Sequence, residues 1–327
     1  MQSYRAVLRV RDARRVLLLG LLIRIPMWAG AVLLTLHVVS HLDRSYGAAG
    51  LLVAAETVAL SISAPWRGRR LDRVGLRAAV APSIAVLSGC WSVAPFVGYW
   101  PLLALVAVAG LFTVPTFSIV RQALMHAVPE PQRKTALSID SVAVEISFMI
   151  GPALGVLLAT VWPTSWALFA CEFASIAGGV ALWIADPPLR SAADAQVEAP
   201  PLERRGWLSP PVLAVLVMSG AATVVLSGSD VSVVAAMREM GHQSWIGWQL
   251  AVWGLGSAVG GLVYGALRRS LPVAGLLALL AAATAPVALA GGPAPMAVLL
   301  FVAGLCCAPT ITATVDTLSR LVPERVR

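Results

Sequence analysis

The sequence predicts an all-α protein that crosses a membrane many times. Of its 327 residues, 58% are hydrophobic and only 12% are charged, which is too apolar for a water-soluble domain. Ten apolar runs each approach the roughly 20 residues that a helix needs to span a hydrocarbon core. The basic residues gather between alternate runs, as they do in the cytoplasmic loops of membrane proteins.

Each apolar run is expected to be a helix, because lipid offers no partner for an unpaired backbone group. The first run follows five arginines, as in a signal peptide, but it continues past Pro26 without a small-residue cleavage site. We therefore expect a retained first span. In chain order, the runs lie near residues 16–39, 47–66, 78–97, 101–121, 136–160, 164–185, 211–234, 245–267, 272–291 and 295–315.

The distribution of Lys and Arg predicts that both ends of the chain are cytoplasmic. With the N-terminus inside, 21 of the 24 basic residues fall on the cytoplasmic side. The longest connection, residues 186–209, is polar and proline-rich, as in a flexible linker. The predicted organisation is a six-helix bundle at residues 1–185, this linker, and a partial bundle of four helices at residues 210–327.

Several other classes of protein are disfavoured. The net charge of +8 comes from scattered loop residues without interleaved aromatics, so no nucleic-acid partner is expected. The four cysteines lie in apolar runs without metal-ligand spacing, so we expect no metal and no cofactor. Neither a metalloprotease motif, nor a hydrolase elbow, nor a nucleotide-binding loop is present. An enzyme and an ATP-driven pump are therefore both disfavoured.

One short basic segment carries a recognisable motif. Between the second and third apolar runs, Gly68, Asp72, Arg73, Gly75 and Arg77 have the spacing G-x-x-x-D-R-x-G-x-R, which is expected to form a cytoplasmic loop. This pattern resembles the loop signature of the major facilitator superfamily of secondary transporters. The resemblance implies a major facilitator fold, here with six plus four spans, and a cytoplasmic gate that this loop engages.

An internal repeat agrees with that fold. Gly110-Leu111 and Pro115-Thr116 recur as Gly304-Leu305 and Pro309-Thr310, 194 residues later, and Val128-Pro129-Glu130 recurs as Val322-Pro323-Glu324. An offset of six spans makes the repeat parallel. The alternative, the inverted repeat of drug/metabolite transporters, would place the two Val-Pro-Glu turns on opposite sides of the membrane. In this register the second half stops after its fourth span, so we expect a truncated chain that lacks two helices.

Ionisable residues inside the spans are the first candidates for function, because each costs about 2.5–3.5 kcal/mol to insert. Arg24 and Glu56 lie at similar depth on consecutive spans. We hypothesise that they form an ion pair in which Glu56 takes up the coupling proton. A static pair that only neutralises two charges is the alternative.

Other acidic residues are assigned by depth. Glu145, about 15 Å into the fifth span, is a candidate for the transport cavity. Asp140, nearer the cytoplasm, is expected to cap the helix or pair with Arg133 or Arg121. Asp230, near the outer end of the seventh span, is a candidate external gate. For Glu172, a structural role is favoured at least as much as a functional one, since the sixth span is peripheral in the resembled fold.

Two further motifs resemble those of antiporters. Gly151, Pro152 and Gly155 match part of the fifth-span antiporter motif and are expected to allow a bend and close helix approach. Arg121 stands where the fourth-span motif has an arginine, and interfacial snorkelling is the alternative. The segment that starts at Asp230 resembles a group of actinobacterial major facilitator proteins.

Together these observations predict a monomeric, multi-pass transporter of the plasma membrane. The expected activity is proton-coupled efflux of a small amphipathic molecule by alternating access. Its partners would be the lipid bilayer, that molecule and protons. The alternatives are uptake or facilitated diffusion of a small polar metabolite, and a truncated membrane protein that transports nothing.

Overall fold

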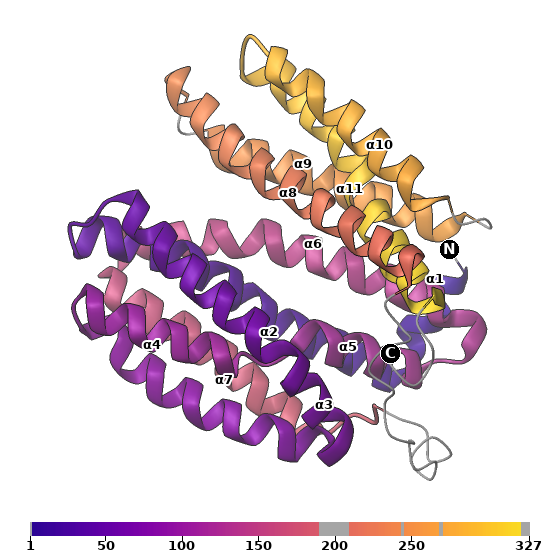
Figure 1. Cartoon of the computed structure of the whole chain (residues 1–327), viewed down its shortest axis with the longest axis horizontal. Coiled ribbons are helices and arrows are strands. Elements are labelled where there is room, and N and C mark those ends of the chain that lie inside the picture. Colours follow the sequence, from indigo (N-terminus) through magenta and orange to yellow (C-terminus); the bar gives the residue numbers. More distant parts are fainter. Residues whose placement is uncertain (1, 190–208, 243–244, 268–270, 322–327) are drawn as a thin grey trace. The chain divides into compact units, whose positions relative to one another are not determined.

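The computed structural model describes residues 2–189, 209–242, 245–267 and 271–321, and its regular structure in these ranges is helical (Figure 1). Eight of the described helical segments are long and apolar enough to cross a membrane. The predicted all-α, multi-pass membrane fold is therefore confirmed. The chain divides into two compact units, Met1–Ser191 and Ala192–Arg327. Most of the predicted linker, residues 190–208, lies outside the described residues.

The first unit is built on α2, which packs against α6 and α7, while α3 packs against α4. Its helices, with one π-helical segment, are α1 (Gln2–Arg9), α2 (Arg11–Leu36), η1 (His37–His41), α3 (Tyr46–Val93), α4 (Tyr99–Phe112), α5 (Thr116–Ala127), α6 (Glu130–Val161) and α7 (Thr164–Ala185). The predicted fourth span is divided between α4 and α5, because Pro115 lacks the N–H that a continuous helix needs.

The basic motif does not form the loop that its charge predicted. Helical structure runs from Tyr46 to Val93 as α3, and the interruption is Gly75, with φ 78° and ψ 175°. The second and third apolar runs are thus the two arms of one kinked element. The predicted loop is wrong in extent, because a single glycine reverses the chain and the charged residues beside it, such as Asp72 and Arg73, lie exposed on helical turns.

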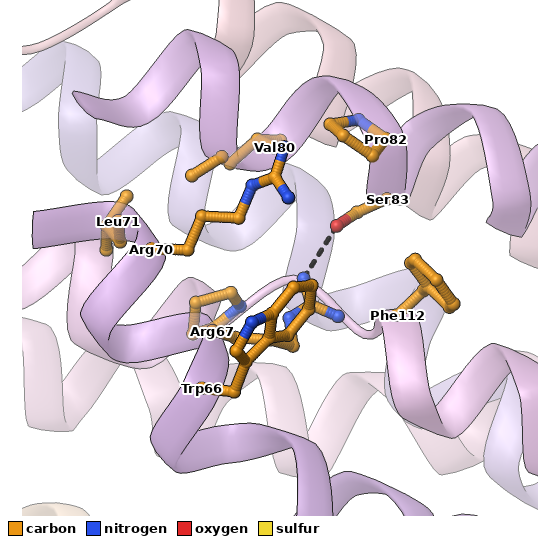
Figure 2. A pocket seen from close by; sticks show the side chains of 10 residues that line it. Trp66, Arg67, Arg70, Leu71, Val80, Pro82, Ser83 and Phe112 are labelled. Carbon is orange, nitrogen blue, oxygen red and sulfur yellow. Dashed lines mark hydrogen bonds between the residues drawn. The ribbon is translucent and has the colours of Figure 1, made fainter. Parts of the chain in front are cut away.

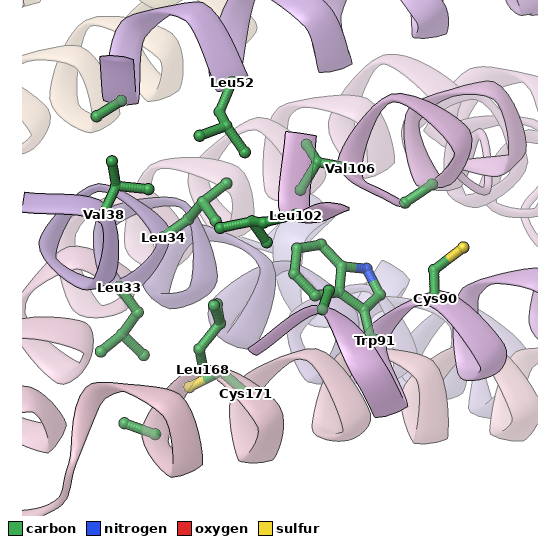
Figure 3. Packing of buried hydrophobic residues seen from close by; sticks show 14 of the residues in the cluster. Leu33, Leu34, Val38, Leu52, Cys90, Trp91, Leu102, Val106, Leu168 and Cys171 are labelled. Carbon is green, nitrogen blue, oxygen red and sulfur yellow. The ribbon is translucent and has the colours of Figure 1, made fainter. Parts of the chain in front are cut away.

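The core of the first unit lies where α2, α3, α4 and α7 meet. Leu33 and Leu34 of α2 face Leu102 of α4, Trp91 of α3 and Leu168 of α7 (Figure 3). In a bilayer such contacts act through close packing, since lipid tails are as apolar as leucine. These contacts hold α2 at the centre of the helices that form the site described below.

The second unit has its closest packing between α9 and α11. Its helices are α8 (Pro210–Glu239), α9 (Ile246–Ala266), α10 (Val273–Thr284) with the short η5 (Ala285–Leu289), and α11 (Pro293–Leu321). A Cβ at Gly256 or Gly260 of α9 would overlap the backbone of α11, and one at Gly304 of α11 would overlap the Trp253 carbonyl of α9. Glycine therefore allows the two backbones to touch.

The sequence repeat has a structural counterpart. Gly110 of α4 approaches α3, where an added Cβ would lie 2.6 Å from the Glu56 carbonyl oxygen. Its repeat partner, Gly304 of α11, makes the same kind of approach to α9. In each unit this glycine packs the fourth span of the unit against the second. The end of the second copy, from Val322, lies outside the described residues.

Candidate functional site in the first helix bundle

The most deeply buried charges form a three-residue cluster between α2, α5 and α6. Arg24 Nη1 donates to Asp140 Oδ1 at 2.6 Å, and Arg121 Nε donates to Asp140 Oδ2 at 3.4 Å. Arg24 is 0% exposed and the Asp140 side chain 1%. The Arg24 guanidinium also lies 4.7 Å from the centre of the Phe117 ring, which adds a cation–π contact. We call Arg24, Arg121 and Asp140 the ion cluster.

Not every hydrogen-bond donor of the ion cluster has a partner. Nε and Nη2 of Arg24 are buried and lack a hydrogen-bond partner among the described residues. Two arginines face one carboxylate, so the cluster keeps a net positive charge, and Arg121 remains 30% exposed. Asp140 is thus the residue on which both ion pairs depend.

The ion cluster corrects one prediction and confirms another. Arg24 pairs with Asp140 and not with Glu56, so the proposed Arg24–Glu56 pair is wrong. Similar depth on consecutive helices did not determine which face of α2 the arginine occupies. The predicted pairing of Asp140 with Arg121, one of three alternatives, is confirmed. Arg133 instead donates to the Met125 carbonyl, and Asp140 lies inside α6, too far along to cap it.

Glu56 faces a cavity of about 170 Å³, together with Glu172 of α7. Both side chains are half-buried, and no described residue donates a hydrogen bond to either or forms an ion pair with it. They are the two ionisable residues of the lining, whose other members come from α2, α3, α4, α5, α7 and the α4–α5 break and are mainly apolar. We call this space the carboxyl cavity.

Two glycines bring these carboxylates to the carboxyl cavity. An added Cβ at Gly30 of α2 would overlap the Glu172 carboxylate. At Gly110 of α4, a Cβ would lie 2.6 Å from the Glu56 carbonyl oxygen and 3.1 Å from its Cα. Neither position accepts a side chain without displacing a glutamate, so the packing of α2 and α4 determines where both carboxylates lie.

The position of Glu172 in the carboxyl cavity was not predicted from the sequence, where a structural role was favoured at least as much as a functional one. The sixth span was treated as peripheral, and depth alone placed Glu172 close to the outer face. The glycine opposite it, Gly30, was a usable signal, because small residues in spans mark close approaches. Sequence spacing does not reveal that Gly30 and Glu172, 142 residues apart, face each other.

The remaining acidic candidates, Glu145 and Asp230, are assigned to neither group. Glu145 is half-buried on α6 and does not line the carboxyl cavity. Asp230 belongs to α8, but its side chain lies outside the described part of the chain. Their predicted roles in the transport cavity and at an external gate stay predictions.

The antiporter-like motif on α6 forms a close helix contact. Cβ atoms at Gly151 and Gly155 would overlap the backbone of α2 around Ile25 and Ala29, and Pro152 lies inside α6 between them. The expected close approach is therefore present, and it joins α6 to the helix that contains both Arg24 and Gly30. Whether the motif serves efflux stays a prediction.

The basic motif of α3 is tied to its own unit at two points. Arg77 donates to the carbonyls of Trp183 and Ile184 and pairs with Asp186 at 3.1 Å, while Trp183 Nε1 donates to the Arg77 carbonyl. The kink is thereby joined to the end of α7. The gating role expected of Gly68, Asp72 and Arg73 stays a prediction.

Arg67, immediately before the motif, holds the break between α4 and α5. It donates from Nη2 to Ser83 Oγ at 2.6 Å and from Nη1 to the Leu111 carbonyl at 3.1 Å, beside a cavity of about 50 Å³ (Figure 2). In a continuous helix the Leu111 carbonyl would accept from residue 115, which is a proline and has no N–H. The arginine supplies the missing donor.

A metal site is not formed by the described residues, in which no three His, Cys, Asp or Glu side chains are grouped. What the two groups can do is bind charge. The ion cluster neutralises a buried arginine, and the carboxyl cavity offers two oxygen-rich side chains to a proton or a cation. Both groups include residues of α2. Arg24 belongs to the ion cluster, and its neighbour Ile23 lines the carboxyl cavity.

Comparison with known proteins identifies the family. The model of the Major Facilitator Superfamily matches residues 16–327. No curated protein sequence matches the chain significantly. Among solved structures, the human organic anion transporter MFSD10 (TETRAN) is similar in fold, with a TM-score of 0.59, 16% sequence identity, and coverage of 96% of this chain and 91% of that one. The chain belongs to the major facilitator superfamily and is a membrane transporter, not an enzyme.

Proposed function

We propose that this transporter exports a small amphipathic molecule across the plasma membrane in exchange for protons, as a monomer working by alternating access. The observation that supports proton coupling is the carboxyl cavity. Glu56 and Glu172 are exposed to one interior space and have no partner among the described residues. A carboxyl group free of ion pairs can gain and lose a proton during each cycle, whereas Asp140 is held by two arginines.

The lining of the carboxyl cavity supports the substrate type that we propose, and the available energy source supports the direction. The carboxyl cavity is mainly apolar, which suits the apolar part of an amphipathic molecule better than a polar metabolite. A family member without a nucleotide site must draw energy from a gradient, and inward proton flow is one that can drive export. The Gly151–Gly155 contact between α6 and α2 also agrees with an antiporter.

The test is transport in proteoliposomes that contain the purified chain. An imposed pH gradient should drive uptake of an amphipathic dye into the more acidic compartment, and collapse of the gradient with a protonophore should stop it. Glu56→Gln should abolish the driven flux. Glu130→Gln, which removes an exposed carboxylate at the start of α6, is the matched control and should leave the flux unchanged. Undiminished gradient-driven flux in Glu56→Gln would contradict the proposal.

Transport of an organic anion is a second candidate. Its support is the net positive charge of the ion cluster, with two buried or half-buried arginines on one carboxylate. MFSD10, which is similar in fold, is named an organic anion transporter. If this candidate is correct, an aromatic carboxylate should be transported, and Arg121→Gln should abolish its flux while Glu56→Gln leaves it intact.

A further inference from the structure

The lining of the carboxyl cavity indicates which type of ligand group could bind there in addition to protons. Its hydroxyl groups have already used their protons: Thr113 donates to Ala109, Thr116 to Val114, and Ser175 to Ile23, each to a backbone carbonyl. Their oxygens remain as acceptors. The side-chain donors of the lining are the indole N–H groups of Trp28 and Trp91. The three hydroxyl oxygens and two carboxylates outnumber them, so the lining favours a ligand group that donates.

The charge of the lining favours a cation. Glu56 and Glu172 are its ionisable members, and the nearby arginine, Arg24, is held by Asp140 on another face of α2. An ionised carboxylate in an apolar space needs a neutralising partner, because burial of an unpaired charge costs several kcal/mol. That partner must be either a proton or a cationic group of the ligand.

The volume limits how much of a ligand enters. A cavity of about 170 Å³ is close to the roughly 150 Å³ that accommodates one benzene molecule, and below the roughly 300–1,000 Å³ of pockets that enclose a whole drug-sized ligand. The cavity thus accepts a head group. Two indole side chains in the lining, Trp28 and Trp91, suit a cationic head group, since indole is the strongest cation–π partner.

We propose that the carboxyl cavity is the subsite for the protonated amine of an amphipathic substrate, and that this amine and protons compete for the same two carboxyl groups. An ammonium group that enters displaces protons from Glu56 and Glu172 to the solution, one for each positive charge bound. A proton that returns releases the amine. This inference rests on the proposed proton-coupled export and gives its substrate class and its mode of coupling.

Competition makes binding depend on pH in a defined way. If one proton leaves for each amine bound, the affinity rises up to tenfold per pH unit while the carboxyl groups are protonated. The probe is 4-phenylbutylamine, which is cationic throughout the useful range. Its neutral and anionic counterparts are 4-phenylbutanol and 5-phenylpentanoate. Calorimetry with the purified full-length chain, in buffers of different ionisation enthalpy, measures both affinity and protons released.

We expect the amine to bind, with proton release and tighter binding at higher pH, and both counterparts to bind at least tenfold more weakly. Glu172→Gln should weaken the amine by tenfold or more and reduce proton release, and the double variant Glu56→Gln/Glu172→Gln should remove both. Gly30→Ala should act like Glu172→Gln, because the new methyl group displaces the Glu172 carboxylate.

The matched controls are Gly50→Ala and Glu130→Gln. Gly50 is an exposed position of α3 with no heavy atom near an added Cβ, and Glu130 is an exposed carboxylate. Both should bind the amine as the unaltered chain does. Melting temperatures of all variants separate loss of binding from loss of folding, and a Glu172→Gln chain that is folded and binds normally overturns the inference.

Three further results overturn it: no measurable amine binding by the unaltered chain, equal or tighter binding of 5-phenylpentanoate, and amine binding without proton release. Failure of the proposed function is a different result. If the amine binds with proton release but a pH gradient drives no flux in proteoliposomes, the subsite stands and proton-coupled export fails. If a pH gradient drives dye flux through the unaltered chain but the amine does not bind to it, export stands and the subsite fails.

Discussion

Arg24 shows how a single buried charge is accommodated in a membrane bundle. A guanidinium at this depth is costly, and the Asp140 carboxylate and the Phe117 ring compensate by contact from two other helices. The stability of both arginines depends on one residue. Asp140 accepts from both arginines and is itself buried, so its loss leaves two cations facing each other.

Replacement of Asp140 should therefore be strongly destabilising. Asp140→Asn keeps the shape but leaves Arg24 with an uncompensated charge, and we expect a loss of about 3–5 kcal/mol in the free energy of unfolding. Arg24→Met/Asp140→Leu, which removes both buried partners, should lose much less. Urea or thermal unfolding of the purified chain in detergent measures both. Equal stability of Asp140→Asn and the unaltered chain would show that the ion cluster contributes nothing.

At the scale of elements, α3 is the helix whose form most departs from a plain span. Its two arms are reversed at Gly75, whose φ of 78° and ψ of 175° belong to a region that is essentially restricted to glycine. The second arm is then held by Arg77, which binds the end of α7 through two carbonyls and Asp186. One backbone conformation and one side chain define the turn.

Gly75→Ala should consequently destabilise the first unit, by about 1–3 kcal/mol, because alanine must adopt a strained backbone. The neighbouring Gly68→Ala is the control. Gly68 has helical backbone geometry and no heavy atom near an added Cβ, so alanine there should be neutral or stabilise by up to about 1 kcal/mol. Melting temperatures of the two variants give the comparison, and an equal effect of both substitutions would contradict a special role of Gly75.

At the scale of the whole molecule, the two units repeat one packing device. Gly110 in the first unit and Gly304 in the second each allow the fourth span of the unit to touch the second. A parallel repeat of this kind predicts that corresponding turns lie on the same side of the membrane. From the Lys and Arg distribution we predict that this side is cytoplasmic.

This orientation can be measured by thiol labelling. The four native cysteines, Cys90, Cys171, Cys306 and Cys307, are buried, so background labelling should be low. In intact cells, a membrane-impermeant maleimide should react with Ser45→Cys, at the exposed start of α3. It should reach Arg69→Cys, on an exposed turn before the kink, after permeabilisation only. The reverse pattern would place the N-terminus outside.

Different features of this chain were predictable to different degrees. The membrane class, the helices and the repeat depend on local composition and spacing, and they were recognised without coordinates. The pairing of Asp140 with Arg121 was among the predicted options because their depths agree. The Arg24–Glu56 pair failed, and the place of Glu172 in the carboxyl cavity was not predicted, because both depend on the rotation of helices about their axes.

By itself, the sequence determined that this chain enters a membrane as a series of helices and belongs with the major facilitator proteins. Hydrophobic length and charge between spans act locally, so they can be recognised in the order of residues. The tertiary structure alone decided which charges meet. Close approaches at Gly30, Gly110 and Gly155 set the positions and rotations of α2, α4 and α6, and with them the separation of the ion cluster from the carboxyl cavity. Such contacts join residues far apart in the chain, and no local pattern records them.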